Sequence, residues 1–183
     1  QGNTPCWQHG IDSIAMTGYF SGCLADDANV QTIRGWFSDA DGGVARGLEQ
    51  ALDGRHIACT DTAQGNAETF VFFKGVADSH GLALTAYEGG QHITGNGHAI
   101  QEDADFIAFH TGLNRAPGMK DVYLTNFKNW RDAGGTLFMH FSDVGSYGKY
   151  GSWGALESIA QDTSPKWEAV REVNALPCWW PGC

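Results

Sequence analysis

Three short apolar segments, separated by long helix-compatible stretches, constrain the fold of this chain more than any other feature. They are residues 11–20 (IDSIAMTGYF), 82–90 (LALTAYEGG) and 136–141 (TLFMHF). Runs of this kind are typical of buried strands. Parallel strands are joined by crossovers of a dozen or more residues, usually helices. The alternation therefore predicts parallel βαβ units and an α/β fold.

The stretches between these segments carry apolar residues at three- and four-residue spacing, which predicts amphipathic helices. The expected helices cover residues 30–37, 44–52, 63–81, 99–113 and 117–132, with a last one from residue 163 onward. Gly81 suits a helix end, Pro117 and Pro165 suit first turns, and Thr163 or Ser164 suits a cap.

The number of strands leaves two architectures open. Three strands are expected, or four if residues 57–61 (IACTD) contribute, whereas a (β/α)8 barrel needs eight strands and about 250 residues. The chain has 183 residues, without an internal repeat or a linker. It is therefore either a small open α/β domain or part of a barrel whose other half lies outside this sequence.

The charge balance excludes one class of partner. The formal net charge is −10, and only 11 residues are Lys or Arg, whereas phosphate binding needs clustered basic side chains. No apolar run of about 18 residues is present to predict a membrane span. The sequence indicates neither a nucleic-acid partner nor a transmembrane helix.

The cysteines predict disulfides. All five lack CxxC spacing, which favours disulfides over zinc and hence a secreted protein in an extracellular or periplasmic compartment. Cys178 and Cys183 bracket a C-terminal loop, residues 178–183, distinct from the main unit at 1–177. Cys23 is expected to pair with Cys59.

Cys6 is then left over, and its partner is expected on sequence not present here. The chain begins at Gln1 without a signal peptide, which indicates processing, truncation or a gap in the recorded sequence.

Glu88 is the candidate catalytic residue. Reactive groups in parallel α/β folds gather at the carboxyl ends of strands, and Glu88 ends the segment 82–90 beside two glycines that leave room for a ligand. The alternatives are a helix cap, an ion-pair partner or a solvated loop residue.

Other side chains near the expected strand ends are candidates for substrate binding. They are Tyr19, Tyr87, His92, His140, Asp143 and, in the aromatic loop 146–157, Trp153. Flat aromatic faces can stack on sugars. Three of them have a structural alternative: Tyr19 and Trp153 in packing, and His140 as a hydrogen-bonded core histidine. No cofactor is expected, and the histidine spacing matches no established metal-ligand pattern.

Four strings extend these expectations. AYEGGQHITG (86–95), NRAPGM (114–119), GGTLFMHFSDV (134–144) and YGSWGALESIAQDTSPKW (150–167) occur in this order. Together they resemble the C-terminal part of bacterial secreted proteins often labelled cellulose-binding, which look like clan A glycoside hydrolases with (β/α)8 barrels. The resemblance implies a C-terminal barrel portion, about strands 5 or 6 to 8, completed by an N-terminal half not in this chain.

The resemblance also implies a function. Clan A enzymes carry the nucleophile at the end of strand seven, which falls on Glu88, and Tyr19 would hydrogen-bond it and keep it ionised. Their acid/base belongs to an Asn-Glu pair, which this sequence lacks. Retaining hydrolysis needs two carboxyl groups about 5–5.5 Å apart.

Two functional alternatives follow. In the first, the protein resembles a retaining glycoside hydrolase and acts on a polysaccharide. Its acid/base lies on a missing N-terminal half, which could be disulfide-bonded to this chain through Cys6. In the second, it is a non-catalytic carbohydrate-binding or cell-surface protein.

Overall fold

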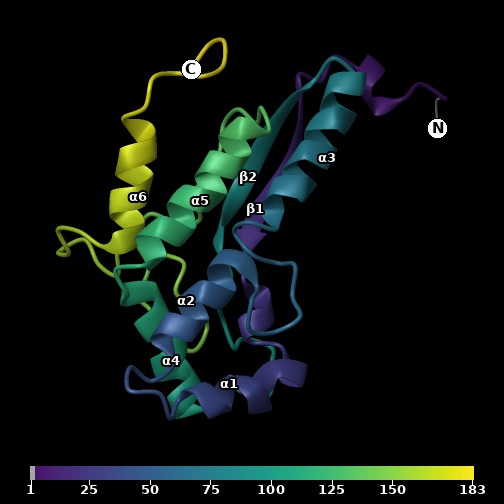
Figure 1. Ribbon diagram of the computed structural model, residues 1–183. Coiled ribbons are helices and arrows are strands. Elements are labelled where there is room, and N and C mark those ends of the chain that lie inside the picture. Colours follow the sequence, from purple (N-terminus) through teal and green to yellow (C-terminus); the bar gives the residue numbers. More distant parts are fainter. Residues whose placement is uncertain (1–2) are drawn as a thin grey trace.

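Two parallel strands form the sheet of this protein (Figure 1). The structure is a computed structural model that describes residues 3–183, so the processing expected at Gln1 lies outside the described residues. Strand β1 spans Ser13–Phe20 and strand β2 spans Ala83–Gln91. These are the first two strands that the sequence predicts.

The helices also follow the sequence pattern closely. The α-helices are α1 (Val30–Trp36), α2 (Val44–Asp53), α3 (Asn66–Ser79), α4 (Ala104–Arg115), α5 (Met119–Asp132) and α6 (Pro165–Asn174). Short 3-10 turns span Cys6–Gln8, Gly22–Leu24 and Asp27–Asn29. Ser164 rather than Thr163 caps α6, because its hydroxyl accepts the Trp167 N–H at 3.0 Å.

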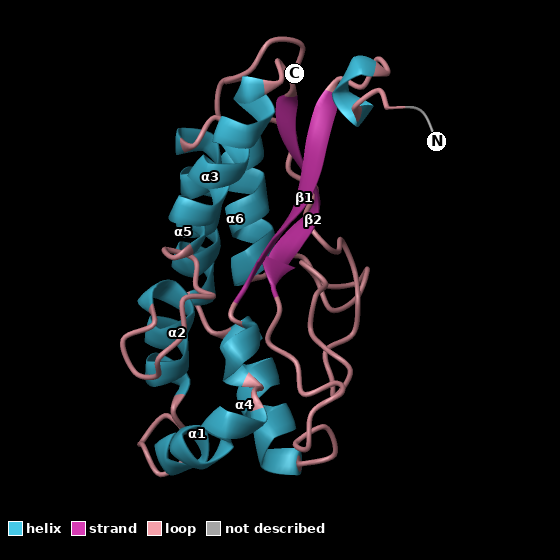
Figure 2. Cartoon of the chain, turned by 90° about the vertical axis from the view of Figure 1, so that its right-hand side faces the viewer, coloured by secondary structure: helices cyan, strands magenta, loops and turns pink. Residues whose placement is uncertain are grey.

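The helices lie in two groups. Helices α3, α5 and α6 lie on one side of the strands, and α1, α2 and α4 lie beyond the carboxyl ends of the strands (Figure 2). One buried cluster, which includes Phe70, Leu84 and Trp130, joins β2 to α3 and α5. A larger cluster, which includes Phe20, Ile33 and Tyr123, fills the region beyond the strand ends. The carboxyl ends of both strands therefore open toward loops that the second group of helices supports.

The expectation of a (β/α)8-barrel portion is wrong. Residues 3–183 form a small α/β domain with two parallel strands and six α-helices, which is not part of a barrel. The expected strand at 136–141 makes one isolated pairing, between Ala86 and Phe138, and residues 57–61 form no strand. Closing a barrel requires a continuous set of hydrogen-bonded strands, which two strands cannot supply.

Irregular hydrogen bonding to β2 keeps the third segment from becoming a strand. Met16 pairs with Ala86, but Thr17 pairs with Glu88, so Tyr87 is a bulge. The N–H groups of residues 136, 139 and 141 donate to the carbonyl groups of residues 84, 86 and 89. Because these intervals differ on the two sides, residues 136–141 follow β2 without a regular ladder.

Two glycines let the strands and this third segment approach closely. Gly18 pairs with Gly89, and the Phe138 ring lies against both. A Cβ atom at either glycine would collide with that ring. Phe138 is held in turn by edge-to-face contacts with Phe127 and Trp130, at centroid distances of 5.1 and 5.4 Å.

The expected cysteine pairs are both present. Cys23 is bonded to Cys59, and Cys178 is bonded to Cys183. Cys6 is exposed and has no disulfide partner within residues 3–183. The pairing agrees with an oxidising environment for the folded chain.

No helix within residues 3–183 has the length and apolar character needed to cross a membrane.

Removal of the Cys23–Cys59 bond is expected to lower the free energy of unfolding. The bond spans 36 residues, and closing a loop of that length in the unfolded chain corresponds to about 3–4 kcal/mol. Urea denaturation of the Cys23→Ser/Cys59→Ser variant measures the loss. The Cys178→Ser/Cys183→Ser variant is the control, because its bond spans 5 residues and should lose less. An equal or larger loss in the control contradicts the prediction.

Candidate functional site

Tyr19 and Glu88 meet where β1 and β2 end. The register places Thr17 opposite Glu88 and Tyr19 opposite Gly90. Tyr19 and Glu88 therefore lie near the carboxyl ends of neighbouring parallel strands. The pKa of Tyr19 is raised to about 12, chiefly by burial and in addition by the charge of Glu88 and hydrogen bonding to its side chain. Tyr19 is therefore a protonated phenol beside the Glu88 side chain.

His92 lies beside this pair, immediately after β2. Its ring centroid is 5.1 Å from that of Tyr19 and 5.8 Å from that of Trp153. The Trp153 indole N–H lies 3.4 Å from His92 Nδ1 and donates to it. Burial lowers the pKa of His92, although Asp61 and Glu88 act in the opposite direction. A neutral imidazole with Nδ1 as acceptor fits both observations.

Two aromatic rings complete the cluster. Phe141 contacts Tyr19 and Trp153 edge-on, with centroids 6.4 and 6.0 Å apart. Phe141 is 41% exposed and Trp153 is partly exposed. We call Tyr19, Glu88, His92, Phe141 and Trp153 the strand-end cluster. It combines one carboxylate, two hydrogen-bonding groups and two accessible aromatic faces.

Buried polar residues hold the Trp153 loop against β2. The amide of Gln91 donates to the Ser152 carbonyl at 2.8 Å and accepts the Ile93 N–H at 2.7 Å. Lys166 of α6, which is fully buried, also donates to the Ser152 carbonyl. Burial lowers the pKa of Lys166 well below its usual value. These contacts fix the residue that precedes Trp153, and so they position its ring.

Other sequence candidates lie elsewhere. His140 contacts the buried Tyr123, with 3.4 Å between Nε2 and the hydroxyl, and burial lowers the pKa of His140 to about 4. His140 and Asp143 line a cavity of about 220 Å³ together with Trp179 and Trp180. Tyr87 is the bulge residue and is 53% exposed. The structure thus brings Tyr19, His92 and Trp153 to Glu88, and places His140 and Asp143 beside a different cavity.

Sequence reasoning missed Asp61 in this region, and it placed Phe141 at a strand end without giving it a role. Asp61 lies close enough to His92 to affect its pKa, and it is two residues after the disulfide-bonded Cys59. The expected Cys23–Cys59 pair was the available signal, because it brings residues 59–61 to the end of β1. For Phe141, the signal was its place at the end of the segment 136–141.

Comparisons with known proteins give no relative for this chain. No protein-family model matches it, and no curated protein or solved structure matches it. Within residues 3–183, no group of three or more His, Cys, Asp or Glu side chains is arranged to hold a metal ion. With no relative to indicate a function, the geometry of the strand-end cluster is the basis for proposing one.

The contact between Tyr19 and Glu88 predicts a measurable change in titration. The Glu88→Gln substitution removes the negative charge, so the pKa of Tyr19 should fall from about 12 toward 10.0. It should remain above 10.0, because burial is the largest cause of the shift and is unchanged. NMR titration with 13C-labelled tyrosine measures this value. Glu68→Gln on α3 is the matched control, and an equal fall in both variants argues against the contact.

Proposed function

We propose that the strand-end cluster binds an oligosaccharide or polysaccharide and that Glu88 is the nucleophile of a retaining glycoside hydrolase reaction. The observation that carries the proposal is the Tyr19–Glu88 contact, framed by His92, Phe141 and Trp153. Aromatic faces and a few convergent polar groups are what a sugar-binding site requires. The resemblance of the YEGGQH and GSWGALE strings to secreted cellulose-binding proteins supports the same class.

The reaction assigns separate roles to the residues. Glu88 would attack the anomeric carbon while a second carboxyl group protonates the departing glycosidic oxygen, and water would then release the covalent sugar. The Tyr19 hydroxyl would donate to Glu88 and hold the attacking oxygen in place. Neutral His92 would position a sugar hydroxyl, and Trp153 would stack on the ring of the reacting sugar.

The proton donor is proposed to come from polypeptide beyond residues 3–183, either another segment or another chain. Clan A-like chemistry places it on an Asn-Glu pair, which the 183 residues lack. Tyr87, Leu137, Met139 and Phe141 are exposed beside β2, and exposed apolar groups of this kind are typical of contact surfaces. The exposed Cys6 thiol provides a possible covalent link to that polypeptide.

A non-catalytic carbohydrate-binding or cell-surface protein is the second candidate. It is favoured by the presence of a single carboxylate, Glu88, in the strand-end cluster. In this case Glu88 would accept hydrogen bonds from sugar hydroxyl groups. Both candidates place the protein outside the cytoplasm, as a secreted extracellular or periplasmic protein, in agreement with its disulfides.

The Glu88→Gln variant separates the two candidates. In the longest native form of the protein, we expect this variant to release reducing sugar from β-linked glycans at least about 100-fold more slowly than wild type, because the amide cannot form the covalent intermediate. Glu68→Gln should retain wild-type turnover. Undiminished turnover in Glu88→Gln removes Glu88 from the mechanism. Binding without any turnover in wild type supports the non-catalytic candidate.

Replacement of Trp153 tests the binding face. Trp153→Ala should weaken glycan binding by about tenfold, which is the upper end of the range for losing one aromatic contact. Isothermal titration calorimetry measures the affinity. Trp7→Ala, in the N-terminal 3-10 turn, is the control and should bind as wild type does. An unchanged affinity in Trp153→Ala contradicts a stacking role.

A further inference from the structure

A polar cavity adjoins the strand-end cluster on the side of the Cys23–Cys59 disulfide. Its volume is about 470 Å³, within the range of about 300–1,000 Å³ typical of small-molecule sites. Its polar lining includes Asp26, Asp61, His92, Thr94, Asn96 and His98. We infer that this cavity is a second sugar subsite, which binds the neighbouring unit of a neutral oligosaccharide held at Glu88. The inference rests on the proposed function.

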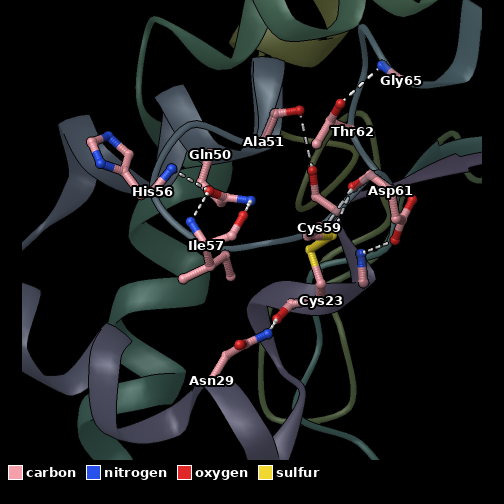
Figure 3. Close-up of a disulfide and its surroundings, with 12 residues drawn as sticks. Cys23, Asn29, Gln50, Ala51, His56, Ile57, Cys59, Asp61, Thr62 and Gly65 are labelled. Carbon is pink, nitrogen blue, oxygen red and sulfur yellow. Dashed lines mark hydrogen bonds between the residues drawn. A yellow bond between two sulfur atoms is a disulfide. The ribbon is translucent and has the colours of Figure 1, made fainter.

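The wall of the cavity is built around Asp61. Asp61 Oδ2 accepts the Gly22 N–H at 2.6 Å, and the Asp61 carbonyl accepts the Ser21 N–H at 2.9 Å. The disulfide joins Cys23, next to Gly22, to Cys59, two residues before Asp61 (Figure 3). Two backbone contacts and one covalent bond thus fix the Asp61 carboxylate relative to the end of β1.

His92 connects the cavity to the strand-end cluster. The His92 ring contacts the rings of Tyr19 and Trp153. His92 also lines the cavity together with Asp61. The charges of Asp61 and Glu88 both affect the pKa of His92. A ligand that extends from Glu88 past His92 therefore reaches Asp61.

The lining selects the chemistry of the ligand. Asp61 is exposed and lines the cavity, so its carboxylate can accept a further hydrogen bond from a ligand. The carboxylates of Asp26 and Asp61 accept hydrogen bonds, and Thr94 and Asn96 can accept or donate. Hydroxyl groups of a sugar match these acceptors. Two carboxylates, in a chain with a formal charge of −10, disfavour acidic or sulfated sugars.

Titration with β-1,4-linked glucose oligosaccharides of two lengths tests the subsite. Wild type should bind the tetrasaccharide more tightly than the disaccharide. Asp61→Asn should weaken tetrasaccharide binding by about tenfold, the effect of losing one charge-assisted hydrogen bond, and leave disaccharide binding unchanged. The asparagine oxygen can still accept the Gly22 N–H, so the wall should remain folded. Asp162→Asn, an exposed loop change, is the matched control.

The possible outcomes separate the two proposals. Equal weakening at both lengths, or no weakening at either, overturns the subsite while the proposed function stands. Equal affinity of wild type for both lengths does the same. Absence of binding at either length overturns the proposed function and the subsite together. Urea denaturation of Asp61→Asn shows whether a loss of binding reflects unfolding; a folded variant with length-selective loss supports the subsite.

Discussion

The close approach of Gly18 and Gly89 under the Phe138 ring determines where the other parts of this protein lie. Without side chains at these positions, β1 and β2 can pair while residues 136–141 run alongside. Residues of the strand-end cluster follow a short distance along each segment. Tyr19 comes after Gly18, His92 comes soon after Gly89, and Phe141 comes soon after Phe138. Aromatic packing of Phe138 against Phe127 and Trp130 then attaches this arrangement to α5. The strand-end cluster can thus assemble because two glycines let the backbones of β1 and β2 and the Phe138 ring come close together.

Local patterns in the sequence predict local structure well here and predict assembly poorly. Helical periodicity located the helices, and the Ser164 and Pro165 signal placed the start of α6. The apolar runs located β1 and β2. The segment 136–141 is similarly apolar, but its hydrogen bonds to β2 fall at unequal intervals on the two sides and form no ladder. Whether strands form a ladder is a property of two segments together. The segments alone left a small α/β domain and a barrel portion open, and the barrel expectation that the resemblance added was wrong.

The same distinction applies to the site. Glu88, Tyr19, His92 and Trp153 were identifiable because each lies near a strand end or belongs to an aromatic loop, and the structure places them together. His140 has a similar sequence position but lies against Tyr123, because alternate residues of an extended segment face opposite sides. Asp61 could be found only through the covalent link between Cys23 and Cys59. Side-chain direction and cross-links carry the information that position along the chain does not.

The Cys23–Cys59 bond also connects the chemistry of the cavity to the compartment in which the chain folds. In a reducing cytosol both cysteines would remain thiols, and hydrogen bonds alone, such as those of Asp61 to residues 21 and 22, would hold the segment that carries Asp61. After export, oxidation would fix that segment permanently beside the strand ends. The wall of the proposed subsite would then become rigid only in an oxidising compartment.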